Sequence, residues 1–213
     1  MRKIFLTACL LIPICVYSQE SHNRYVVWVT PTGKNNVAIY GLALGLMALP
    51  NYGHLQIGGI NVELNPFAIF TLPGSMITTM LNPIEGDFYA DPAEGIRTEI
   101  HGISISAGMF EEVEMNGVSL NINSYVGVSH GLELSMWMNS NYSYSGAQLS
   151  LWGNRAVEGN GLQVGCFNSC KDCRGIQIGF LNRMGNRVLP IINFNFRKNN
   201  QKSKKHSKPN RKR

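Results

Sequence analysis

The sequence predicts an all-β repeat protein with a β-solenoid as the favoured architecture, and three observations lead to this prediction. Glycine recurs every 14 or 15 residues between residues 102 and 175. Apolar residues stand one, three and five positions after each of these glycines, and only polar residues or glycine stand between them. Alternation of period two is typical of a half-buried β-strand, and no helical period fits. The regular spacing therefore indicates an array of repeats.

The recurring glycines are interpreted as architectural. Each is expected at a corner, where the backbone needs a positive φ angle or a close approach to another strand. A phosphate-binding glycine fingerprint needs a strand, a tight turn and then the start of a helix, whereas these glycines precede strands. Asn139, Asn154, Asn168 and Asn182, which follow strands, suit turns. The corner glycines are Gly102, Gly117, Gly131, Gly146, Gly161 and Gly175.

The apolar triplets are expected to point into one shared interior. The first triplet is Ile103, Ile105 and Ala107, and the same three positions are apolar in all six repeats. Cys166 occupies the third position of its triplet, so it is expected in the core. Looser copies of the alternation occur upstream, within residues 37–64.

Two architectures fit a β-repeat of this length. In a solenoid each unit forms one coil, and equivalent residues stack about 4.8 Å apart. In an antiparallel meander or a small outer-membrane β-barrel, each unit forms one strand and its turn. Membrane strands need about 9 to 11 residues, whereas the clean alternation here lasts about six residues. The solenoid is therefore favoured, with the meander or barrel as the alternative.

The chain divides into six segments. Residues 1–18 have the charged start and short apolar run of a signal peptide, which predicts export to the periplasm, outer membrane or cell surface. Residues 19–36 form a lead-in and residues 37–64 the early repeats. Residues 65–99 are interpreted as an insertion or a cap that covers an open end of the array. Residues 100–196 form the regular array, and residues 197–213 a disordered basic tail.

The positive charge of the chain is concentrated in this tail. Residues 197–213 contain nine Lys and Arg and no acidic residue, whereas residues 19–196 contain eight basic and 13 acidic residues, a net charge of 8 − 13 = −5. The tail predicts weak contact with polyanions. It has no aromatic residues for base stacking, so specific nucleic-acid recognition is not expected. Membrane association is left open, and the envelope or surface partner is unknown.

The cysteines and histidines do not form a recognisable catalytic or metal site. Cys170 and Cys173 are expected to form a local disulfide, because a zinc ribbon needs two such pairs and a redox motif needs a βαβ unit. His54, His101 and His130 are scattered along the sequence. No catalytic residue, metal or cofactor is therefore expected, and the chain is interpreted as a non-enzyme.

The last two repeats resemble a known family. They read GLQVGCFN (161–168) and GIQIGFLN (175–182), and RVLPIINFNF follows at 187–196. This pattern is similar to that of the uncharacterised exported surface-repeat proteins of Gram-negative bacteria, whose units read roughly G-L-Q-I-G-L-x-N. The resemblance is specific in these two units and loose in the four before them. It implies a repeat fold in the cell envelope with a structural or interaction role, and it supplies no catalytic residues.

Overall fold

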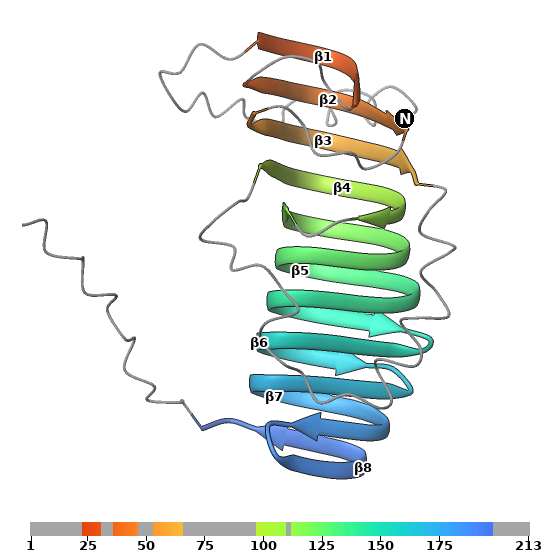
Figure 1. The fold of residues 1–213 in the computed structure, drawn as a ribbon, viewed down its shortest axis with the longest axis vertical. Helices are drawn as coiled ribbons and strands as arrows, with labels where there is room; N and C mark the ends of the chain where they lie inside the picture. Colours follow the sequence, from red (N-terminus) through yellow and green to blue (C-terminus); the bar gives the residue numbers. More distant parts are fainter. Residues whose placement is uncertain (1–22, 31–35, 47–52, 66–96, 110–111, 198–213) are drawn as a thin grey trace, which may run out of the picture.

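The computed structural model describes residues 23–30, 36–46, 53–65, 97–109 and 112–197, and it shows a β-solenoid (Figure 1). One eight-stranded sheet contains all the strands in sequence order, with β1 to β7 parallel and β8 antiparallel to β7. The favoured architecture is thus confirmed. The strands are β1 (Asn23–Thr30), β2 (Val37–Leu46), β3 (Leu55–Leu64), β4 (Thr98–Met109), β5 (Val113–Ser150), β6 (Gly153–Val164), β7 (Phe167–Met184) and β8 (Arg187–Asn195).

Several expectations concern residues outside these ranges. The signal peptide, most of the insertion or cap and nearly all of the basic tail lie outside the described residues. The early repeats lie inside them except for residues 47–52. β2 and β3 pair in parallel, and β3 pairs directly with β4 although Gly59 and its partner Gly102 are 43 positions apart in the sequence. The early repeats are therefore rungs of the same solenoid.

A column of glycines runs through this stack and sets its register. Gly59 lies on Gly41, and the same contact continues rung by rung to Gly175. At Gly161, φ is +143° and an added Cβ would lie 1.8 Å from the backbone oxygen of Gly146. L-residues with side chains rarely adopt this backbone region, and no side-chain carbon fits at that distance. The column therefore requires glycine for both its φ angle and its close backbone approach.

The apolar triplets do share one face, but the prediction that they face the interior is wrong. Ile178 and Phe180 in β7 are exposed, whereas Gln177 between Ile176 and Ile178 is fully buried. The same inversion recurs in β5 and β6, where Gln148 and Gln163 have no exposed surface. The triplets therefore form an outer face, and the polar residues between them fill the interior.

The polar interior is stable because in-register parallel rungs place like amides above one another, as in cross-β ladders. Gln177 Nε2 donates to Gln163 Oε1 over 2.7 Å, and Gln163 Nε2 donates to Gln148 Oε1 over 2.8 Å. Gln148 Nε2 donates in turn to Glu133 Oε2 over 2.7 Å. Each amide thus donates to the preceding rung, so the burial of its amino group costs little.

A second ladder consists of the asparagines that were expected in turns. Asn139 Nδ2 donates to Asn154 Oδ1, Asn154 Nδ2 to Asn168 Oδ1, and Asn168 Nδ2 to Asn182 Oδ1, each over 2.8 Å. All four side chains are buried. The structure places these residues within β5, β6 and β7 and not in turns after them, and their side chains hold successive rungs together from the inside.

The apolar core of the first rungs occupies a different column, two positions before each glycine. Ile39, Ile57, Ile100 and Met115 lie there, each at most 2% exposed. They form one hydrophobic cluster together with neighbouring residues such as Val37. The solenoid interior therefore has an apolar side before the glycine column and a polar side after it.

The apolar side changes character in the last rungs. Tyr144 occupies the column there, and its ring fills the space above Gly159, where an added Cβ would lie 2.0 Å from the ring. Cys173 lies on the other side of Gly159 and is joined to Cys170 by a disulfide. Tyr144, Ala156, Cys170 and Cys173 form a second buried cluster.

Candidate interaction surface

The most extensive candidate functional feature is the outer face formed by the apolar triplets, which we call the apolar outer face. It extends from β2 to β7, and every member stands one, three or five positions after a glycine of the column. None of its members is charged. Its described residues are Leu42, Leu44, Ile60, Val62, Leu64, Ile103, Ile105, Ala107, Val118, Leu120, Ile122, Leu132, Leu134, Met136, Ala147, Leu149, Leu151, Leu162, Val164, Cys166, Ile176, Ile178 and Phe180.

Many of these side chains are open to solvent. Leu151 and Phe180, at the fifth position, are 70% and 75% exposed, and Leu120, at the third position, is 38% exposed. Cys166 is half-buried on this face as a free thiol, so its expected place in the core is wrong. Contiguous exposed apolar surface of this extent marks an interaction site in a soluble protein.

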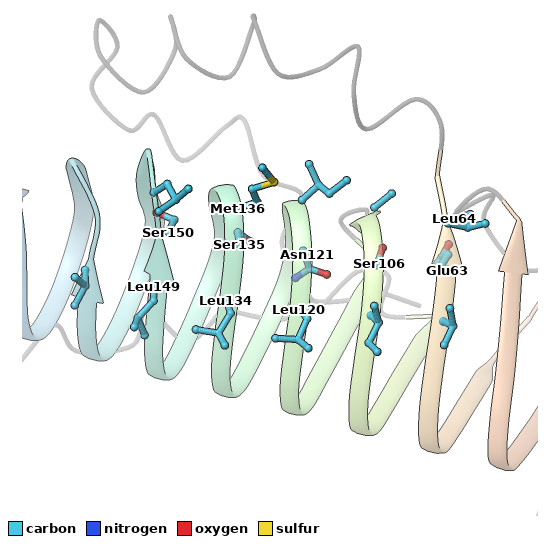
Figure 2. Close-up of a pocket in the computed structure, with 16 residues that line it drawn as sticks. Glu63, Leu64, Ser106, Leu120, Asn121, Leu134, Ser135, Met136, Leu149 and Ser150 are labelled. Atoms are coloured by element: carbon cyan, nitrogen blue, oxygen red, sulfur yellow. The ribbon is translucent and has the colours of Figure 1, made fainter.

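The middle of the apolar outer face is hollowed into a shallow groove of about 760 Å³ (Figure 2). The groove runs along the stack from Val62 in β3 to Val164 in β6. Leu120, Leu134 and Leu149 form a row on successive turns along it. Because the rungs are in register, apolar residues line the groove along its whole length, and Glu63 is the one charged residue in its lining.

An aromatic column borders the face immediately after the fifth position. The rings of Trp137 and Trp152 stack with centroids 5.5 Å apart, and Phe167 continues the column 5.0 Å from Trp152. Tryptophan is enriched among the residues that contribute most to protein interfaces. The column therefore adds an aromatic edge to the apolar outer face.

The other outer side of the solenoid, which we call the polar outer face, carries residues one and three positions before the glycines, together with His54, five positions before Gly59. On it, the His54 ring Nε2 lies 3.2 Å from Glu99 Oε1, and Gln56 Nε2 donates to Glu99 Oε2 over 3.4 Å. His101 Nε2 lies 3.6 Å from Glu99 Oε2. The stacking thus brings together His54 and His101, which looked scattered in the sequence. These side chains are partly exposed, so their pairing contributes little stability.

Glu133 is a carboxyl with a raised pKa that lies inside the solenoid. Burial raises the pKa of Glu133, and hydrogen bonds from Gln148, Asn141 and Ser129 lower it by a smaller amount. Asn141 Nδ2 donates to Glu133 Oε1 over 3.1 Å. Burial also raises the pKa of Tyr144, and the charge of Glu133 raises it further. Glu133 occupies the position of a glutamine in the ladder and accepts from Gln148, so its contacts are those of a residue that holds rungs together.

The residues singled out from the sequence are placed as follows. The six corner glycines all have positive φ, between +128° and +143°, and lie in the glycine column. Cys170 and Cys173 form a disulfide in the interior, away from the apolar outer face. In the part of the chain that the structure describes, no cluster of His, Cys, Asp and Glu side chains could hold a metal ion.

Sequence reasoning missed the face as a surface because it assigned the same residues to the core. One signal could have identified the interior: glutamine recurs at 148, 163 and 177, always two positions after a column glycine. No helix long and apolar enough to cross a membrane occurs among the described residues. Comparison with protein-family models, curated proteins and solved structures gives no match for this chain.

Proposed function

We propose that this chain is a non-catalytic repeat protein, exported to the cell envelope, with a structural or interaction role carried by the apolar outer face. The observation that carries the proposal is the exposure of large apolar side chains on seven of the eight rungs from β2 to β7, without a charge among them; on the rung after Gly161 the face residues are half-buried. Leaving such a surface in water costs roughly 25 cal/mol for each Å² of apolar area, so a binding partner that covers it gains free energy.

The arrangement of the solenoid supports this role. Backbone hydrogen bonds and the amide ladders hold successive rungs together, so the stacking does not depend on the outer side chains, and these are free to contact a partner. A face with the same apolar positions on each rung and a shallow groove along its middle provides an extended contact surface, as in other repeat proteins. The signal-peptide-like residues 1–18 and the resemblance to surface-repeat proteins support an envelope location.

Thiol labelling of the envelope fraction tests the proposal. Leu151→Cys places a thiol on the apolar outer face. Ser145→Cys places a matched thiol on the polar outer face, at the residue directly before Gly146. Both variants carry Cys166→Ser, which removes the free cysteine of the described residues. We expect the chain in the envelope fraction, with the thiol at 145 labelled rapidly and the thiol at 151 protected.

Two results would contradict the proposal. One is a chain that remains in the cytoplasm with residues 1–18 intact. The other is equal labelling of the two thiols in the envelope, which would mean that nothing covers the apolar outer face there.

A further inference from the structure

We infer that the partner of the apolar outer face is a second copy of this chain, packed face to face. This inference rests on the proposed function and names the partner of the same surface. Three properties of the face carry it: its lack of charge, its area and its regular shape.

The distribution of charge suits self-association. In a two-fold dimer the same patch meets itself, so any charge on the patch would face a like charge in its neighbourhood. The apolar outer face has no charged member, whereas Glu99, Glu158 and Asp172 lie at the third position before a glycine, on the polar outer face. Face-to-face pairing therefore brings uncharged triplet side chains together and leaves these carboxylates on the outside of the dimer; Glu63, at the β3 end of the groove, is the one charged residue that lines it.

The area of the face is sufficient for a stable dimer. Eight column glycines, from Gly41 to Gly175, mark eight rungs. At about 4.8 Å per rung the face is about 38 Å long, and five residues at about 3.3 Å make it about 17 Å wide. The product is about 600 Å² per copy, or about 1,200 Å² for two copies, which reaches the range of specific interfaces. The aromatic edge at Trp137 and Trp152 adds to this area.

The shape of the face also suits a second copy. Leu120, Leu134 and Leu149 form a row on successive turns along the groove (Figure 2). Met136 and Leu151, each two positions after a leucine of this row, also line the groove and are more exposed. Two flat sheets with such rows pack about 10 Å apart with their side chains interdigitated, as the sheets of a β-sandwich do. An identical face supplies rows with the matching spacing between rungs.

Sedimentation of the purified full chain without detergent tests the inference. We expect a dimer at micromolar concentration. Leu120→Glu and Leu151→Glu each place a charge on the face of both copies, and each should weaken the dimer at least about 100-fold. Ser145→Glu adds the same charge to the polar outer face and should leave the dimer intact. Both face side chains point away from the interior, so circular dichroism should show an unchanged β-sheet spectrum for all three variants.

The outcomes separate this inference from the proposed function. A monomeric wild type, or a dimer that persists in both folded face variants, overturns self-pairing. If that monomer keeps the thiol at 151 protected in the envelope, the proposed function stands with another occupant. Binding of the monomer to phosphatidylcholine–phosphatidylglycerol vesicles would then identify lipid as that occupant. If the monomeric chain instead dimerises when residues 66–96 are replaced by a glycine-serine linker, that segment is the occupant of the apolar outer face.

Discussion

The asparagine ladder provides the sharpest test of the polar interior. Asn154 is fully buried, accepts a hydrogen bond from Asn139 and donates to Asn168 Oδ1 and to the backbone oxygen of Val164, all over 2.8 Å. Asn154→Ala removes these three hydrogen bonds, at about 1 kcal/mol each. It also leaves the buried Asn168 Oδ1 without this donor, which costs a further 1–3 kcal/mol or so. The expected loss is therefore about 4–6 kcal/mol.

Urea unfolding followed by far-ultraviolet circular dichroism measures this loss. With a slope of about 2–3 kcal/mol/M for a domain of this size, the unfolding midpoint should fall by about 2 M. Asn160→Ala is the matched control, because Asn160 lies in the same strand but is exposed, and its cost should be within about 0.5 kcal/mol. If Asn154→Ala costs no more than Asn160→Ala, the ladder does not hold the rungs together.

Two further predictions concern the glycine column and the buried carboxyl. Gly161→Ala should abolish the β-sheet spectrum, because its Cβ would lie 1.8 Å from Gly146 O. Gly185→Ala is the control: φ is +56° there and the nearest atom to an added Cβ is 3.4 Å away, so it should lower the free energy of unfolding by only about 1–2 kcal/mol. A folded Gly161→Ala protein of near wild-type stability would contradict the packing of the column. Burial raises the pKa of Glu133, so the folded chain holds that proton more tightly than the unfolded chain, and stability should fall as pH rises from the ordinary value of 4.5 through the raised pKa. Glu133→Gln should therefore increase the free energy of unfolding in urea more at pH 8 than at pH 4, and an equal effect at both pH values would refute this.

The inside and outside of the rungs show where sequence reasoning fails. The alternation of Ile176, Gln177 and Ile178 establishes that the strand has two unlike faces, but it does not establish which face is buried. The usual preference for apolar interiors favoured the isoleucines. Two features of the stack reverse this preference: Ile100 and its equivalents fill the interior before the glycine, and Gln163 satisfies Gln177 after it.

The pairing of distant segments was also beyond the sequence. His54 lies beside Glu99 only because β3 pairs with β4 across an interruption of the repeat. The alternation within residues 37–64 indicated further repeats, but it gave no register for them. Register depends on backbone pairing between rungs, and a single strand carries no information about its neighbour.

The amino-acid sequence by itself determined the period, the β-strands, the column of glycines and the gathering of the apolar triplets on one face. These follow from local chemistry, since alternation of period two and recurrent glycine act on each rung separately. Only the tertiary structure decided which face is the interior and that the apolar face is the outer surface. The physical reason is that a buried amide needs a hydrogen-bond partner on a neighbouring rung, and that contact exists only after the rungs have stacked.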